Sequence, residues 1–152
     1  MKFNEKRAIS EIVATVLIIL ITVAAIGIIW GAVMPMIKEN MQSGQACLKA
    51  KLGIDTTSGY TCYNASSNTV FVVVTRGSET YNLTGIELIV SGGGNSTRKD
   101  FNASLPSENE ARKYNITTTY SIDQAAVAPI IRIGATTKIC DLSAEVVVSP
   151  CS

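Results

Sequence analysis

Histidine is absent from the 152 residues of the chain. Its absence removes the commonest general base and the commonest transition-metal ligand of proteins. The four cysteines contain no C-x-x-C pair, so a zinc site built on thiolates is also disfavoured. No phosphate-binding loop or nucleophile elbow occurs in the chain. We therefore expect no enzyme: no catalytic residue, no metal and no cofactor.

Basic residues are too few and too scattered for nucleic acid. Thirteen Lys and Arg are nearly balanced by twelve Asp and Glu, which gives a formal net charge of +1. Only the first few residues gather positive charge. Because nucleic-acid binding depends on a surface that neutralises phosphates, we exclude a nucleic-acid partner.

Charge is missing altogether from residues 12–37. A helix of this length rises about 39 Å, more than the roughly 30 Å of a hydrocarbon core, so the segment can span a membrane. One alternative is a buried core helix, although so small a protein rarely buries a helix that is apolar all round. Another is a cleaved secretory signal, with Lys2, Lys6 and Arg7 before it and Gly44-Gln45-Ala46 after it. Such signals have apolar runs of only about 7 to 15 residues.

The flanks of the apolar segment predict its orientation. Three basic residues precede it, whereas only Lys38 follows closely, so the N-terminus is expected in the cytoplasm and the chain beyond Glu39 outside. Pro35 predicts a bend, because proline removes a helical hydrogen bond and clashes with the preceding turn. A polar helical extension is expected to about Gln45.

Beyond Ala46 the pattern changes to short β-branched runs. Glycine, serine and asparagine turns separate them, as expected for a small β-sandwich. The predicted strands are 70–75, 86–90, 126–133 and 145–148, and the predicted turns are 76–78, 92–94, 105–107 and 141–144. The predicted fold class is α+β, with a long apolar helix followed by an all-β domain.

The junction Glu5-Lys6-Arg7-Ala8-Ile9-Ser10-Glu11 joins a short charged leader to the apolar helix. Here the chain resembles precursors of archaeal type IV pilins. In that family a prepilin peptidase cuts on the cytoplasmic side, after a small residue preceded by a basic one, and the helix stays on the mature subunit. The resemblance implies that Arg7 and Ala8 precede the cut and that Ile9 becomes the new N-terminus. An uncleaved signal anchor is the alternative.

The resemblance also implies a division of the chain and a function. Residues 1–8 would be the leader, 9–45 the membrane and filament-core helix, and 46–152 an extracellular, immunoglobulin-like sandwich. The expected function is that of a structural subunit of an adhesive surface filament. Motility is less favoured, because the glycine-rich opening of archaeal flagellar filament proteins is missing.

The partners implied are further copies of the chain, the prepilin peptidase, the pilus assembly machinery and, before assembly, the cell membrane. The expected location is therefore the cell surface. A monomeric, membrane-anchored binding protein is the main alternative.

Glu11 has two explanations. In bacterial pilins an acidic residue five positions into the mature helix pairs with a neighbour's terminal amine, whereas Glu11 would be third after the predicted cut. Alternatively, its carboxylate offsets the helix dipole in the first turn, after Ser10 as the cap.

Gly27 and Gly31 form a G-x-x-x-G pair, with Ala24, Ala25 and Ala32 nearby. Small residues let helix backbones approach closely in lipid. The pair therefore predicts a packing contact between helices, although chance matches are frequent in membrane helices.

Two further features point outside the cell. Five N-x-[ST] motifs follow the apolar segment, where about two would be expected by chance, so N-linked glycans are predicted. Their asparagines are Asn64, Asn82, Asn95, Asn102 and Asn115.

The four cysteines, Cys47, Cys62, Cys140 and Cys151, also follow the apolar segment and predict two disulfides. A hairpin over residues 53–56 favours Cys47 with Cys62, which leaves Cys140 with Cys151 by exclusion. Because a hairpin at 141–144 would carry Cys151 away from Cys140, Cys47 with Cys151 stays open.

Overall fold

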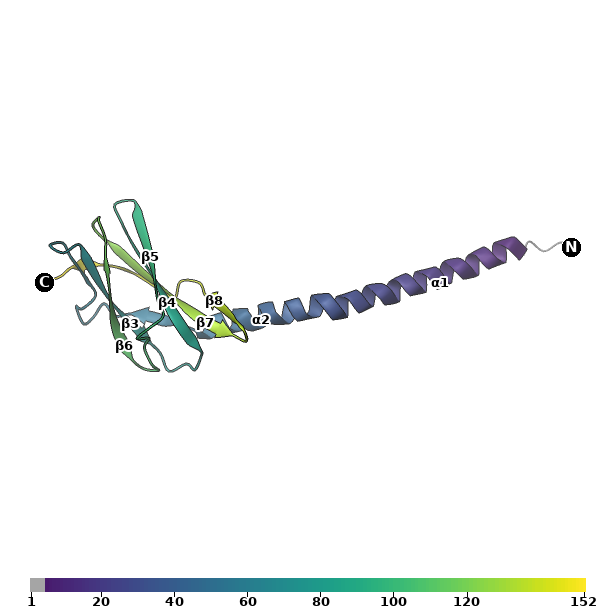
Figure 1. Cartoon of the computed structure of the whole chain (residues 1–152), viewed down its shortest axis with the longest axis horizontal. Helices are drawn as coiled ribbons and strands as arrows, with labels where there is room; N and C mark the ends of the chain where they lie inside the picture. Colours follow the sequence, from purple (N-terminus) through teal and green to yellow (C-terminus); the bar gives the residue numbers. More distant parts are fainter. Residues whose placement is uncertain (1–4) are drawn as a thin grey trace. The chain divides into compact units, whose positions relative to one another are not determined.

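The computed structural model describes the backbone of residues 5–152 and the side chains from Ile12 onward (Figure 1). The chain divides into two compact units, Met1–Met41 and Gln42–Ser152. A long apolar helix is followed by two β-sheets, which confirms the predicted α+β class.

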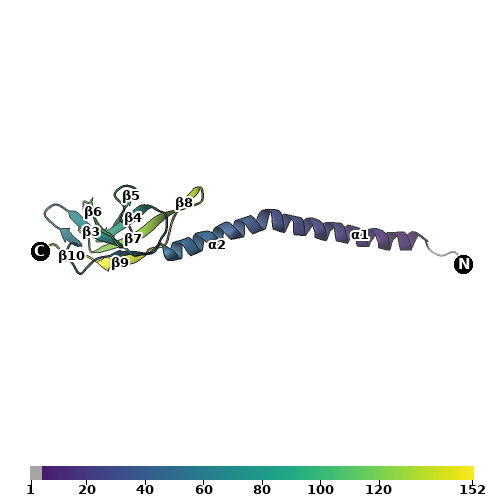
Figure 2. The same ribbon diagram turned by 90° about the horizontal axis from the view of Figure 1, so that it is seen from below.

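The helical segment has three parts: α1 (Glu5–Ile28), a π-helical turn η1 (Ile29–Val33) and α2 (Met34–Lys49). It extends to Lys49 rather than ending near Gln45. In η1 the backbone N–H of Met34 donates to the carbonyl of Ile29, the wider i→i+5 pattern. This turn lies immediately before Pro35, where a regular helix would bring the proline ring against the preceding turn. The helix bends there (Figure 2), as predicted.

The β unit consists of two five-stranded sheets. The first contains β1 (Leu52–Ile54), β2 (Cys62–Asn64), β3 (Thr69–Arg76), β6 (Ala111–Thr117) and β10 (Ser149–Pro150). The second contains β4 (Leu83–Gly92), β5 (Asn95–Phe101), β7 (Gln124–Ile133), β8 (Thr136–Ile139) and β9 (Ala144–Val147). Strand neighbours are antiparallel except for β2 and β10.

One hydrophobic core joins the two sheets. Alternate residues of β3, including Val70 and Val72, pack in the same cluster as Ile86 and Leu88 of β4, and all four are fully buried. Tyr114 and Ile116 of β6, in the first sheet, belong to the same core. The shared core confirms a β-sandwich, while its immunoglobulin-like variant stays a prediction.

All four predicted strands are present, as β3, β4, β7 and β9. The predicted turn at 92–94 joins β4 to β5 and requires glycine, because Gly93 and Gly94 have positive φ angles. A Cβ on Gly92 would clash with the carbonyl oxygen of Ser121.

Sequence reasoning missed β1, β2, β5, β6, β8 and β10. Most are short, and β5 is a polar edge strand with its side chains largely in solvent. Edge strands of this kind lack the apolar alternation on which strand prediction relies.

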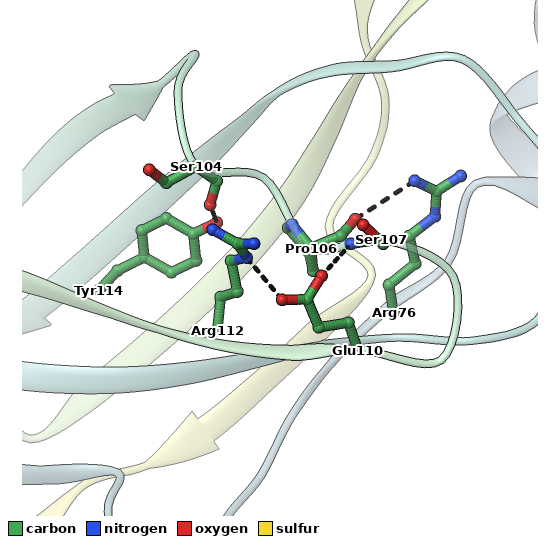
Figure 3. A network of polar contacts seen from close by, with 7 residues as sticks. All are labelled: Arg76, Ser104, Pro106, Ser107, Glu110, Arg112 and Tyr114. Atoms are coloured by element: carbon green, nitrogen blue, oxygen red, sulfur yellow. Dashed lines mark hydrogen bonds and ion pairs between the residues drawn. The ribbon is translucent and has the colours of Figure 1, made fainter.

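The long connection between β5 and β6 is fastened at several points (Figure 3). The hydroxyl of Tyr114 donates to the carbonyl of Ser104 at 2.8 Å. Arg76, at the end of β3, donates to the carbonyl of Pro106 at 3.3 Å, and it also donates to the carbonyl of Tyr81 at 2.8 Å. The bonds to Ser104 and Pro106 hold the loop that begins with Asn102, one of the predicted glycosylation sites.

Glu110 closes the same loop near the start of β6 (Figure 3). Its carboxylate accepts the backbone N–H of Ser107 at 2.7 Å and the Nε of Arg112 at 2.8 Å. The Ser107 bond and then Arg112 lower the pKa of Glu110, because both favour the ionised carboxylate. The loop is therefore held by polar contacts in addition to the core.

A second polar turn connects β1 to β2. Oδ1 of Asp55 accepts the N–H and the hydroxyl of Thr57, both at 2.8 Å, and the N–H of Ser58 at 3.3 Å. The Ser58 side chain, followed by Thr57, lowers the pKa of Asp55 from 3.8 to about 2. The hydroxyl of Thr61 donates to the carbonyl of Asp55 and accepts the N–H of Val73, which fixes the turn to β3.

Strong acid should loosen this turn. Because the folded pKa of Asp55, about 2, lies below its ordinary value of 3.8, its contribution to stability is full above pH 3.8 and is lost as the pH falls toward 2. Ser58→Ala should raise the pKa of Asp55 by removing the largest cause of the shift. Ser67→Ala, which does not touch Asp55, is the control. An NMR titration of the carboxyl measures both, and a pKa near 3.8 in the unaltered protein would contradict the assignment.

Candidate assembly helix, glycosylation sites and disulfides

The described part of the chain contains one helix, Ile12–Lys49, that is long and apolar enough to cross a membrane. Every side chain of α1 from Ile12 onward is exposed, including Leu17 at 53% and Ile21 at 67%. Trp30 in η1 is also 67% exposed. A core helix of a soluble protein would be mostly covered. The core-helix alternative is therefore disfavoured for this segment.

Two threonines interrupt the apolar surface without leaving an unpaired hydroxyl. Thr15 donates to the carbonyl of Ile12 and Thr22 to that of Ile19, each at 2.9 Å. Such bonds to the preceding turn satisfy a hydroxyl inside an apolar environment. Both hydroxyls are therefore satisfied within the helix itself.

Gly27 and Gly31 are not required by packing within the chain. A Cβ placed on either would meet no atom within 4 Å. Neither has a positive φ angle. Their small size therefore serves no described contact of this chain, whereas close approach of a second helix would use it.

The predicted cleavage residues lie at the edge of the described structure. Arg7, Ala8 and Ile9 belong to α1, but their side chains, like that of Glu11, lie outside the described ones. Residues 1–4 of the predicted leader are not described. The cleavage and the two roles of Glu11 stay predictions.

The five predicted glycosylation sites all lie in the β unit, spread over its strands and loops. Asn82, Asn95, Asn102 and Asn115 are exposed, and Asn64 is partly exposed. Oδ1 of Asn64 accepts the backbone N–H groups of Ser66 and Ser67, which leaves its amide nitrogen without a partner among the described residues. Each site is therefore open to solvent, as glycan attachment requires.

The four cysteines form two disulfides, as predicted, but the two favoured pairings and the open alternative, Cys47 with Cys151, are all wrong. Cys47 is bonded to Cys140, with 5.4 Å between Cα atoms, and Cys62 to Cys151, with 4.9 Å. Cys47 lies in the last turns of α2 and not in a hairpin strand opposite Cys62. After β9 the chain crosses to the other sheet, where β10 pairs with β2 and places Cys151 beside Cys62.

The disulfide of Cys47 forms part of a second, smaller hydrophobic cluster. Ala50, Ile131 and Cys140 are its buried members, and Ala46 and Cys47 pack against them. The end of α2 is therefore fixed to the second sheet both covalently and by apolar contact.

An exposed apolar groove adjoins this disulfide and was not predicted. Leu48 of α2, Ile139 of β8 and Leu142 beyond it line the groove, with Lys51 and Lys138. These three apolar side chains are 51% to 73% exposed. No sequence motif marks the groove, because its two walls are far apart in the sequence.

Comparisons with known proteins found no match to the chain among family models, curated proteins or solved structures. The apolar helix and the two disulfides are together typical of a membrane-anchored or extracellular protein.

Replacing Cys47 and Cys140 by serine should lower the free energy of unfolding of the β unit by about 2 to 5 kcal/mol, because this bridge closes a long loop. Denaturant unfolding of the double variant against the unaltered protein measures the loss. Peptides from a non-reducing digest should contain Cys47 linked to Cys140 and Cys62 linked to Cys151. A peptide linking Cys47 to Cys62 would show that the assigned pairing is wrong.

Proposed function

We propose that the protein is a structural subunit of an extracellular, type IV pilus-like filament that serves adhesion. Its apolar helix anchors the precursor in the membrane and becomes the core of the polymer after cleavage. The β unit is carried outside the cell and is N-glycosylated. The partners are other copies of the chain, the prepilin peptidase, the assembly machinery and, before assembly, the membrane.

The observation that carries the proposal is the exposed apolar helix. Burying one Leu- or Ile-sized side chain stabilises by roughly 1.5 to 3 kcal/mol, so a stripe of this length cannot stay in water. The chain itself buries none of the most apolar part of this helix. Lipid covers the helix of a membrane-held subunit, and the helices of neighbouring copies cover it in a filament.

The glycines support burial against a helix in addition to lipid. Contact with lipid does not require glycine at positions 27 and 31, and neither do the contacts within the chain. Close packing of a neighbouring helix, by contrast, requires small residues at such positions. The glycines therefore support the filament over the monomeric membrane-anchored alternative, which needs only a span.

The β unit supports an external position. Its four cysteines are all bonded in disulfides, which persist in oxidising surroundings. Its five asparagine motifs are open to solvent. Both features agree with the N-in, C-out orientation derived from the basic leader.

Cleavage should follow Ala8, so that the mature protein begins at Ile9. N-terminal sequencing of the protein from the cell surface measures this. Ala8→Leu should hold the precursor uncut, because the predicted cut follows a small residue, while Ala14→Leu should be processed normally. A mature protein that begins at Met1 or at Cys47 would contradict the proposed processing.

Gly31→Leu should abolish or strongly reduce filaments by holding neighbouring helices apart. Ala14→Leu is the matched control, because at 100° per residue on an ideal helix Ala14 lies about 100° from Gly31 and about 140° from Gly27. Negative-stain microscopy and sedimentation of sheared surface material measure assembly.

Both helix variants should keep the two disulfides, which the β unit forms independently of residue 31. Deletion of residues 1–40 should give a soluble monomer. Filaments from the deleted form would rule out the helix as the core, and normal filaments from Gly31→Leu would rule out the packing role of that glycine. A full-length protein that never forms filaments would favour the monomeric anchor.

A further inference from the structure

Asn82, one of the predicted glycosylation sites, lines a pocket beside the end of α2. The pocket encloses about 290 Å³, near the lower end of the roughly 300 to 1,000 Å³ that is usual for ligand sites. The last turns of α2 form one wall, and residues 80–82 with residues 131–132 of β7 form the other. A sugar attached to the exposed side chain of Asn82 would therefore begin at the edge of this pocket.

The backbone that carries Asn82 is held in place on both sides. The carbonyl of Asn82 accepts the backbone N–H of Arg132 at 3.0 Å. Just before it, the hydroxyl of Tyr81 donates to the carbonyl of Lys51 at 3.2 Å, and the guanidinium of Arg76 lies 4.3 Å from the centre of the Tyr81 ring. Tyr81 also packs against the small hydrophobic cluster at the end of α2. The point of attachment for a sugar therefore has little freedom to move away from the helix.

Polar side chains line the pocket from both walls. Gln42, Gln45 and Lys49 come from α2, whereas Thr80 and Arg132 come from the opposite wall. All five are exposed, and none of their side chains forms a hydrogen bond with another described residue. Amide, ammonium, hydroxyl and guanidinium groups can donate to sugar hydroxyls, and the amide and hydroxyl oxygens can also accept from them. The pocket therefore offers the hydrogen bonds that suit a sugar.

We propose that the first sugars of a glycan on Asn82 fill this pocket and bind the last turns of α2 through Gln42, Gln45 and Lys49. Covalent attachment decides the occupant, because a tethered group meets the adjoining wall at a high effective concentration, so that weak contacts suffice. The inference rests on the N-glycosylation included in the proposed function.

The sugar would be a second link between the end of α2 and the sandwich. The Cys47–Cys140 disulfide joins these turns to the residue that follows β8. The sugar would join them to the start of β4, since Asn82 directly precedes this strand. Loss of the sugar should therefore loosen the end of α2 without unfolding the sandwich.

Hydrogen exchange of the full-length protein in detergent micelles, read by mass spectrometry, measures this loosening. In Asn82→Gln, which cannot carry the sugar, the backbone amides of residues 42–49 should exchange about fivefold faster, as expected from the loss of about one net hydrogen bond. Asn115→Gln is the matched control, because it removes a sugar site from β6 and should leave the exchange of these amides unchanged.

Gln45→Ala tests the α2 wall of the pocket. It should speed the exchange of the same amides in the glycosylated protein but have no further effect in Asn82→Gln, because both changes remove the same contact. Asn40→Ala is the control on α2, since Asn40 is exposed and is not among the residues that line the pocket. Its effect should be the same with and without the sugar.

The outcomes separate this inference from the proposed function. Sugar on Asn82 with unchanged exchange in Asn82→Gln would overturn the inference and leave the proposed function standing. Equal acceleration in Asn115→Gln, or full additivity of Gln45→Ala with Asn82→Gln, would do the same. An Asn82 without sugar while other sites carry it would also overturn the inference alone. A bare peptide mass for the whole chain would overturn both the inference and the proposed glycosylation.

Discussion

The exposed apolar surface of the helix is the constraint on which the rest of this protein depends. Its backbone is satisfied by its own hydrogen bonds and even its threonine hydroxyls are bonded to the preceding turn, so only its side chains need cover. The chain supplies none for the described part of α1. Cover must come from lipid or from other molecules, as for the helix of a membrane-anchored protein or a signal sequence.

The β unit, by contrast, has to remain folded in water at the end of this helix. Its main core is shared by two sheets, and a smaller cluster at Ala50 and Ile131 fixes the end of α2 to the second sheet. The Cys47–Cys140 disulfide adds a covalent link at the same place. The last turns of the helix are therefore part of the β unit, so a neighbour that packs on these turns also contacts the sandwich.

Charged and apolar side chains are unevenly distributed over the sandwich. Arg98, Lys99 and Asp100 lie along β5, whereas exposed apolar side chains lie on α2, β8, β9 and the loop between these two strands. An uncovered apolar patch is compatible with solubility only if it is small or is covered in the assembled state.

The sequence by itself determined the span, the strands with continuous β-branched runs and the presence of two disulfides, because each depends on local composition or on a simple count. It determined neither polar edge strands such as β5 nor the disulfide pairing. The pairing of Cys62 with Cys151 depends on the crossing from β9 to β10 and on the parallel register of β10 with β2. The groove beside Leu48 likewise required tertiary structure, since its walls come from residues 44–51 and 138–143. Contacts between segments so distant in sequence leave no local periodicity, so only the folded chain brings them together.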